Sequence, residues 1–395
     1  MGGRVETRAG ASVTRRACRV VTTTMTARLL LGHQLQVLDE VSWTVVTGDA
    51  YEAAPPNLDV EVVPMRREFA PSDIVAFVGL WRYFRRRRFD FVQTHTPKAS
   101  FLGLPAARLG GTTAIYTIHG ALYFRDNGRV ANVMGWVFER WCCAWADLVL
   151  VQSREDFDVL PNARVCNPRK IRFLGNGVVL DHFTTPVAPE ASPSSPPGEP
   201  APKVPTVLMV SRLVREKGCA DFLGLARSLR GRATFVHVGP VEHDQRDALS
   251  DAEIAAATDD VTFVGAVDDI RPFLSEADVV VQPSYREGVP RVAIEAAVAG
   301  RPVVGYDVRG VREVIDPTSG LLVPRGDTVA LLETVQRLLD DPQRRVALGE
   351  SCRRRVVERF SEDDVITRLR AVYAELTGPR GARGTRASMP PPPPD

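Results

Sequence analysis

Residues 279–306 read VVVQPSYREGVPRVAIEAAVAGRPVVGY, and this stretch predicts a strand, a loop, a helix and a second strand. The valines at 279–281 are β-branched and uninterrupted, which is typical of a buried strand. Pro290 suits the first turn of a helix, because the N–H that proline lacks would have no partner there. A strand, helix and strand in this order form the basic unit of an α/β fold with parallel strands.

The same alternation continues on both sides of this stretch. Short apolar, β-rich runs separated by helical patterns occur at residues 19–23, 43–47, 60–64, 89–94, 113–119 and 148–152, and again at 206–210, 234–238, 261–264, 279–283 and 302–306. We therefore expect two Rossmann-like α/β domains with parallel sheets. Ligands of such sheets bind beyond the carboxyl ends of the strands, so the two sheets are expected to face a central cleft.

Two segments with the composition of unstructured chain mark the domain boundaries. Residues 184–205 are rich in Pro, Ser and Ala, and residues 378–395 end in PPPPPD. The chain of 395 residues also exceeds the usual domain size of roughly 100 to 200 residues. The expected organisation is a disordered extension at 1–17, an N-terminal domain at 18–183, a Pro-rich linker or insertion at 184–205, a C-terminal domain at 206–360, a helix at 361–377 and a disordered tail at 378–395.

The overall composition excludes some classes of protein. Fifty basic and 48 acidic residues leave a formal net charge of +2, which argues against a nucleic-acid binder that relies on bulk positive charge. The sequence has no apolar run of about 18 residues and no secretory signal at its start. The six cysteines form no Cys-x-x-Cys pair, which fits a reducing compartment. We expect a cytoplasmic protein.

The loop and helix start within 284–295 have the chemistry of a site for an anion and a polyol. A helix N-terminus offers unpaired N–H groups, so the amides near Gly288, Val289 and Pro290 could hold a diphosphate, with Ser284 at the start of the same loop. Glu287 and Glu295 lie eight residues apart, and a carboxylate accepts several hydroxyl hydrogen bonds at once. The alternative interpretation is a pair of solvated glutamates.

The segment SYREGVPRVAIEAAVAGRPVV resembles the Glu-x7-Glu region of glycosyltransferase family 4, retaining enzymes with the two-domain GT-B fold. The resemblance implies that Glu287 contacts the sugar of a nucleotide-sugar donor and that Glu295 contacts its ribose. It also implies that Arg212 and Lys217, in VSRLVREKG, bind the diphosphate. Two positive charges there could replace a metal ion in stabilising the departing nucleotide. Gly239, after the next strand, is expected on the same donor side.

The N-terminal half carries weaker signals for the acceptor side. His119 in YTIHG occupies a position at which the family has a histidine near the reacting carbon of the sugar, so a catalytic role is implied. His95 and Lys98 lie in THTPKA, which is similar to the branch of the family that extends lipid-linked sugars in surface polysaccharide biosynthesis. Thr23 and Thr24 stand where many members have a Gly-Gly loop, which is a departure from the family pattern.

These resemblances lead to the expectation of a retaining, metal-independent hexosyltransferase without a cofactor. The expected donor is UDP-hexose or UDP-N-acetylhexosamine, and the expected acceptor is a hydroxyl of a polyprenyl-diphosphate-linked saccharide. Two alternatives remain open: a nucleotide-sugar epimerase, and a non-catalytic nucleotide-sugar-binding partner in a polysaccharide assembly complex. Nothing in the sequence indicates a nucleic-acid partner.

Three further segments have two interpretations each. The helix expected at 73–88 ends in four arginines, so it either packs on the core with a solvated end or rests on an anionic membrane. The aromatic residues Trp136, Phe138, Trp141 and Trp145 favour core or interdomain packing. Asp156 and Asp158 form an Asp-x-Asp pattern, which we interpret as a solvated helix start and not as a metal site.

Overall fold

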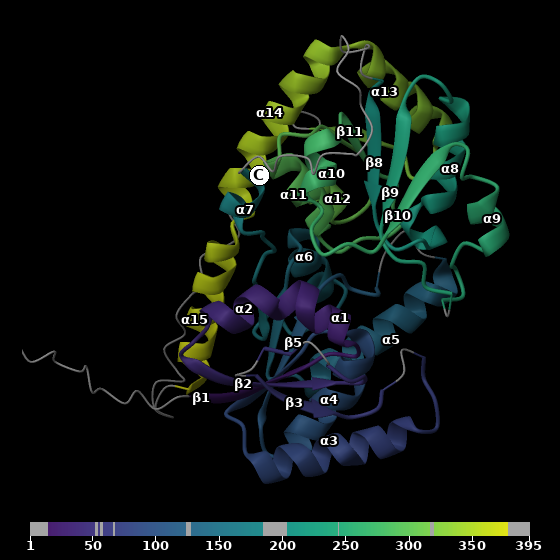
Figure 1. Cartoon of the computed structure of the whole chain (residues 1–395). Helices are drawn as coiled ribbons and strands as arrows, with labels where there is room; N and C mark the ends of the chain where they lie inside the picture. The colour runs from purple at the N-terminus through teal and green to yellow at the C-terminus, as the bar shows by residue number, and fades with distance from the viewer. Residues whose placement is uncertain are drawn as a thin grey trace, which may run out of the picture. The chain divides into compact units, whose positions relative to one another are not determined.

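The computed structural model describes residues 15–51, 54–55, 58–65, 68–123, 128–184, 204–243, 245–316 and 320–377. The described chain divides into two compact units, each with its own sheet (Figure 1). The first unit contains residues 15–152, 156–174 and 366–377, and the second contains 153–155 and 175–365. The expected tail at 378–395, and nearly all of the expected linker at 184–205, lie outside the described residues.

The sheet of the first unit has seven parallel strands in the order β3-β2-β1-β4-β5-β6-β7. The strands are β1 (Arg15–Val20), β2 (Val41–Thr47), β3 (Asp59–Val62), β4 (Phe91–Thr94), β5 (Thr113–Ile118), β6 (Leu148–Val151) and β7 (Ile171–Phe173). The sequence analysis placed the first strand at 19–23, but β1 begins at Arg15, so residues 15–17 of the expected extension at 1–17 belong to the strand, and residues 1–14 lie outside the described residues. Three arginines in this strand, Arg15, Arg16 and Arg19, obscure its pattern, although Ala17, Cys18 and Arg19 are fully buried. β7 is only three residues long and was missed.

Helices cover both faces of this sheet. They are α1 (Thr24–Thr26), the π-helix η1 (Ala27–Leu31), α2 (Gly32–Val37), α3 (Asp73–Arg87), α4 (Pro97–Leu109), α5 (Arg129–Trp145), α6 (Arg154–Asn162) and α15 (Glu362–Thr377). Leu80 of α3 and Leu104 of α4 pack with Val20 and Val92 in one core cluster. The helix expected at 73–88 is therefore confirmed as α3, which packs on the core.

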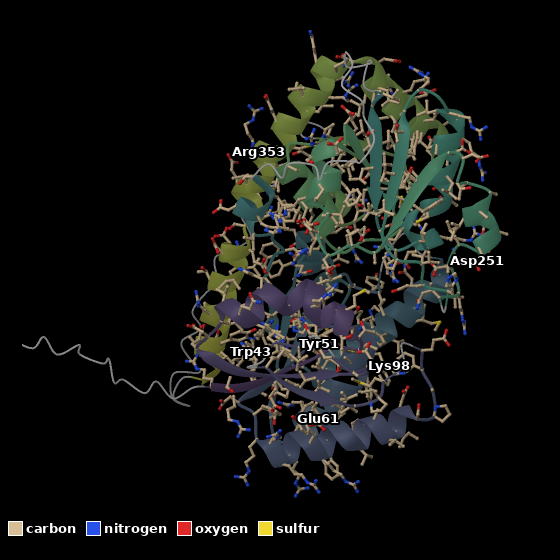
Figure 2. The ribbon with its side chains drawn as sticks, viewed as in Figure 1. Trp43, Tyr51, Glu61, Lys98, Asp251 and Arg353 are labelled. Atoms are coloured by element: carbon tan, nitrogen blue, oxygen red, sulfur yellow. The ribbon has the colours of Figure 1, made fainter. Side chains whose placement is uncertain are left out.

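A buried polar network ties α15 to the opposite face of the same sheet. The guanidinium of Arg19 donates to the Tyr373 hydroxyl at 3.2 Å, and that hydroxyl donates to Gln93 at 2.6 Å. The Tyr373 ring stacks on Phe91, and Arg19 lies over the ring of Trp43, which Figure 2 labels. The last helix of the chain is thus part of the first unit, because its buried hydroxyl satisfies groups on β1 and β4.

The second unit has six parallel strands in the order β10-β9-β8-β11-β12-β13. The strands are β8 (Thr206–Val210), β9 (Thr234–Val238), β10 (Val261–Gly265), β11 (Val279–Gln282), β12 (Val303–Tyr306) and β13 (Leu321–Val323). The helices are α7 (Leu180–Thr184), the 3-10 helix η2 (Arg215–Lys217), α8 (Cys219–Ser228), α9 (Asp251–Ala255), α10 (Arg271–Glu276), α11 (Arg291–Val298), α12 (Val311–Val314), α13 (Thr328–Asp340) and α14 (Pro342–Arg359).

The stretch 279–306 forms the strand, helix and strand that its pattern predicts. Val279, Val280 and Val281 of β11 are fully buried, because β11 lies inside the sheet with β8 on one side and β12 on the other. Of the expected strands in this half, all are present, and the short β13 was missed. Among the residues that the structure describes, no helix is both long enough and apolar enough to span a bilayer.

Candidate functional site

Two loops at the carboxyl ends of β8 and β11 pack directly against each other. The amide of Tyr285 donates to the carbonyl of Glu216 at 2.9 Å. Gly218 has φ 76°, and a Cβ at this position would overlap the carbonyl oxygen of Pro283. Any larger residue at Gly218 would push the two loops apart, so glycine holds the chain of Lys217 close to the chain that carries Glu287.

Lys217 and Glu287 meet where these loops touch. The ammonium of Lys217 donates to Oε1 of Glu287 at 2.7 Å, and the two side chains are 18% and 10% exposed. The side-chain amide of Gln282 donates to the same oxygen at 2.9 Å and to the hydroxyl of Ser284 at 2.8 Å. Ser284 is fully buried, so its hydroxyl supports Gln282. Gln282 orients Glu287 and was missed by the sequence analysis.

The loop after β9 brings a third segment to the same edge of the sheet. Gly239 has φ 143°, and a Cβ there would overlap the carbonyl oxygen of Ser211. This close approach explains why glycine stands at the end of β9. Arg212 lies on the adjoining loop, where its guanidinium donates to Glu242 at 2.8 Å and is 35% exposed. Arg212 and Lys217 therefore both have a carboxylate partner in this structure.

The helix expected after the loop is α11, and Pro290 is its N-cap, one position before the place expected from sequence. Two contacts that sequence reasoning missed fix the approach to this helix. The Asn176 amide donates to the Val289 carbonyl at 2.9 Å. Gly310 has φ 80°, and a Cβ there would overlap the carbonyl oxygen of Gly288. The backbone at Gly288, Val289 and Pro290 is therefore held in place before any anion binds.

Glu295 lies about one turn into α11 and is 12% exposed. Burial raises the pKa of its carboxyl group, and the Arg291 guanidinium, 3.7 Å away, offsets this only in part. A partly buried carboxylate with one distant partner has spare capacity to accept hydrogen bonds. Glu295 can thus receive a diol.

We predict that Glu295→Gln stabilises the unliganded protein at neutral pH but weakens binding of UDP. The folded-state pKa is raised, so the native state binds more protons than the unfolded chain, and stability is lost as pH rises through that pKa. The neutral amide removes this loss but accepts with only one oxygen. Thermal unfolding of the variant from pH 4 to pH 8, with and without UDP, measures both effects.

The exposed Glu350 provides the matched control for that measurement. Glu350→Gln should change neither the pH dependence of unfolding nor the shift that UDP produces. A Glu295→Gln protein with wild-type UDP affinity would show that this carboxylate does not contact the nucleotide.

In the first unit, the threonine-rich segment after β1 opens a helix. Thr23 is the N-cap of α1, and its hydroxyl lies 2.9 Å from that of Thr26. The amide of Thr24 donates to the Asp49 carboxylate at 2.8 Å. A carboxylate of the chain itself thus occupies the position at which a helix N-terminus would receive an anion. Compared with a Gly-Gly loop, Thr23 and Thr24 therefore have larger side chains, and they also form hydrogen bonds within the protein.

His95 and His119 follow β4 and β5 and form a chain with Gln152. Nδ1 of His119 lies 3.1 Å from the side-chain oxygen Oε1 of Gln152, and Nε2 of His119 lies 3.1 Å from Nδ1 of His95. Nδ1 of His119 is then the protonated nitrogen, and its Nε2 accepts from His95. Burial lowers the pKa of His95, with smaller contributions from His119 and Arg19, so His95 is neutral. These two hydrogen bonds fix the orientation of both imidazole rings.

Lys98 is the expected acceptor-side residue that the structure places least favourably for a ligand. Its ammonium forms a 2.6 Å ion pair with Asp73 and also donates to the carbonyl of Glu68, and the side chain is only 3% exposed. It lies over the ring of Phe69. Figure 2 labels Lys98 in the first unit. The charge of Lys98 is therefore neutralised within the fold, and its role with an acceptor stays a prediction without support.

Two buried carboxylates hold the loop that follows His119. Asp156 accepts from the amide of Ala121 at 3.2 Å and is fully buried, so its interpretation as part of a solvated helix start was wrong. Glu139 accepts from the amide of Leu122 at 2.7 Å and from the Tyr116 hydroxyl at 2.9 Å. Helices α6 and α5 thus each contribute a carboxylate that accepts a hydrogen bond from a backbone amide of this loop. Among the described residues, no group of acidic, His and Cys side chains could hold a metal ion.

Comparison with known protein families identifies the class to which this fold and site belong. Residues 19–182 match the family model "Glycosyltransferase Family 4", and residues 204–341 match "Glycosyl transferases group 1". Together these matches cover most of both units. The chain belongs to glycosyltransferase family 4 and has the two-domain GT-B fold.

The chain is also similar to individual enzymes and solved structures. The chain is 25% identical over 85% of its length to "N,N'-diacetylbacillosaminyl-diphospho-undecaprenol alpha-1,3-N-acetylgalactosaminyltransferase" of Campylobacter jejuni, covering 91% of that protein. It is 23% identical over 77% of its length to "UDP-Gal:alpha-D-GlcNAc-diphosphoundecaprenol alpha-1,3-galactosyltransferase" of Escherichia coli, covering 80% of it. The structure of HepE from Anabaena in complex with UDP-glucose superimposes with a TM-score of 0.73 at 16% identity, covering 91% of this chain and 99% of that one, which supports the fold.

Proposed function

We propose that this glycosyltransferase transfers a sugar from a UDP-hexose or UDP-N-acetylhexosamine to a hydroxyl of a polyprenyl-diphosphate-linked saccharide, with retention of the anomeric configuration. The observation that carries the proposal is the Lys217–Glu287 ion pair, held by Gln282 beside the start of α11. A cation, a carboxylate and a helix N-terminus lie side by side in this arrangement, and we assign them to the diphosphate and the sugar of the donor. Those are the groups that a nucleotide-sugar requires.

Each donor-side group has a distinct part in the proposed reaction. Lys217 and Arg212 exchange their carboxylate partners, Glu287 and Glu242, for the oxygens of the diphosphate. Glu287 is then able to accept hydroxyl hydrogen bonds from the sugar, while Glu295 accepts those of the ribose. Two cations and the backbone amides around Gly288 neutralise the leaving diphosphate, so the proposed reaction needs no metal ion.

The chemical step is attack by an acceptor hydroxyl on the anomeric carbon from the face that the diphosphate leaves. The bond from the anomeric carbon to the diphosphate oxygen breaks as the new glycosidic bond forms, and the proton of the acceptor hydroxyl passes to the departing diphosphate, which leaves as UDP. We assign Glu287 and His119 to positioning of the donor sugar. A sugar hydroxyl donating to Nε2 of His119 would take the place of the hydrogen bond from His95. Thr23 and Thr24 are proposed to contact the acceptor.

The choice of donor and acceptor rests on the activities of the relatives. Both named enzymes act on saccharides linked to diphosphoundecaprenol, one using UDP-Gal and the other transferring N-acetylgalactosamine. HepE, with the same fold, binds UDP-glucose. A uridine diphosphate donor and a lipid-linked acceptor are therefore the combination to test first.

A thermal-shift panel tests the donor assignment. We expect UDP, UDP-glucose, UDP-galactose and UDP-N-acetylhexosamines to raise the unfolding temperature, since a ligand at 100 times its Kd stabilises the native state by about 2.7 kcal/mol. Chelation of divalent ions should leave the shift unchanged. The absence of a shift with every nucleotide-sugar, or a shift that depends on added Mg²⁺ or Mn²⁺, would contradict the proposed site.

A further inference from the structure

Helix α5 turns an apolar stripe to the solvent. Val130, Val133, Met134, Val137 and Trp141 are spaced three or four residues apart, and their exposed fractions range from 41% to 75%. Helical side chains at these spacings lie on one face. A water-soluble helix normally buries such a stripe, so this arrangement requires an explanation.

Close contacts fix the opposite face of α5 to the first unit and prevent rotation of the helix about its axis. Gly135 packs so closely that a Cβ would lie 2.6 Å from the carbonyl oxygen of Leu122. Glu139 is buried by its hydrogen bonds to Tyr116 and Leu122, and Cys142 is buried in the core. Rotation of the helix to bury the valines would leave the Glu139 carboxylate without these partners. The apolar stripe therefore stays exposed.

The stripe continues onto the neighbouring helices. Trp141 stacks on Phe101 of α4 with ring centroids 5.6 Å apart, and Phe101 makes an edge contact with Phe69, which is 59% exposed. α4 lies between α3 and α5 (Figure 1), and the first turn of α3 exposes Ile74 and Val75. We call the five stripe residues with Phe69, Ile74 and Val75 the apolar patch. The patch covers one face of α5, the first turn of α3 and the segment before α3, which exceeds the scattered apolar residues of an ordinary surface.

The charges around the patch select one kind of partner. Within α5, all of which the structure describes, the basic and acidic residues are Arg129, Arg140 and the buried Glu139. The exposed charges of this helix are thus cationic, and the last turn of α3 adds Arg85, Arg86 and Arg87. The acids next to the rest of the patch are Glu68, which precedes Phe69, and Asp73, which is paired with Lys98. A second copy docked on the same helix would bring arginines against arginines. A surface of anionic lipid matches the apolar stripe and the cations together.

We propose that the apolar patch docks this glycosyltransferase on an anionic lipid bilayer, with α5 lying in the interfacial plane. The docking rests on the proposed function, because an acceptor carried on a polyprenyl diphosphate resides in such a bilayer. The surface differs from the one expected from sequence, which was α3 with its arginines. In this proposal the apolar stripe of α5 inserts into the bilayer interface. The arginines at the end of α3 attract the anionic lipid headgroups.

Co-sedimentation with vesicles tests the docking. We expect the full chain to bind phosphatidylglycerol vesicles and to bind phosphatidylcholine vesicles at least tenfold more weakly. Val133→Asp with Val137→Asp should reduce binding to the anionic vesicles at least tenfold. The matched control is Val329→Asp with Val346→Asp, which changes two valines of α13 and α14 with exposed fractions of 64% and 62%, against 63% and 54% for Val133 and Val137. The control should bind as wild type does.

Several outcomes would overturn the docking. They are an absence of binding to anionic vesicles, equal binding by the two double variants, or a shift from dimer to monomer in Val133→Asp/Val137→Asp without loss of vesicle binding. The UDP-glucose thermal shift and transfer to a water-soluble acceptor are measured on the same proteins. Both should survive in the two double variants, so that failure of docking and failure of the proposed function give different results.

Discussion

Replacing Lys217 by methionine is expected to lower kcat about a hundredfold, the usual loss when one preorganised charge that stabilises a leaving group is removed. The Lys217 ammonium is 18% exposed and lies 2.7 Å from Glu287, on a loop that Gly218 keeps against the loop after β11. In the proposed reaction it faces the diphosphate, whose charge grows as the bond to the anomeric carbon breaks. Methionine keeps most of the length of the unbranched side chain and removes the charge together with its N–H donors. Steady-state transfer assays give kcat and KM separately.

Arg215→Met is the matched control for this prediction. Arg215 lies in the same short helix η2, but its guanidinium pairs with Glu253 and is 52% exposed. Its loss should leave kcat within about twofold, since an exposed ion pair contributes little. Equal effects of the two substitutions would mean that Lys217 has no special part in transfer.

Glu287→Gln is expected to lower kcat at least tenfold while leaving the affinity for UDP near that of the wild type. The carboxylate is 10% exposed and is oriented by Lys217 and Gln282, so it can accept sugar hydroxyl groups in a fixed geometry. An amide of the same shape accepts with one oxygen only and carries no charge. Because UDP lacks the sugar that is transferred, the affinity for UDP should not depend on Glu287. Calorimetry with UDP and transfer assays separate the two effects.

The nearby Glu216 offers the comparison for Glu287. Glu216 lies in η2, on the loop after β8, and forms an ion pair with Arg286, in which both side chains are about one-third exposed. Glu216→Gln should leave transfer close to the wild-type rate. Unchanged transfer in Glu287→Gln would refute the assignment of this carboxylate to the donor sugar.

The sequence predicted the fold well where strands are uniformly apolar. The valine run at 279–281 and the strand at 206–210 form β11 and β8 at nearly the expected positions, because buried parallel strands consist of uninterrupted β-branched residues. β1 was misplaced because Arg15, Arg16 and Arg19 interrupt that pattern. Arg19 is buried only because Tyr373, from the far end of the chain, and Trp43 accommodate its guanidinium. No local pattern contains such a distant partner.

The contacts among the candidate site residues could be predicted from sequence where one loop or helix carries these residues, and less so where distant segments support them. Lys217 and Glu287 were identified from local stretches, and the structure brings their charged atoms together. Asn176, Gly310 and Glu139 act on backbone groups of other loops and carry no motif of their own. Asp156 has the appearance of a surface acid in sequence, and only the fold buries it against Ala121. Trp141 was expected inside the protein, but 41% of it is exposed.

The most direct test of the account is to incubate the protein with a UDP-sugar and a diphosphoundecaprenol-linked saccharide and to determine the linkage of the product by NMR. The account predicts stoichiometric release of UDP and a new glycosidic bond with the anomeric configuration of the donor. An inverted linkage would contradict the retaining mechanism. Conversion of the UDP-sugar to an epimer, or binding of every UDP-sugar without transfer or release of UDP, would contradict the assignment as a glycosyltransferase that extends lipid-linked saccharides.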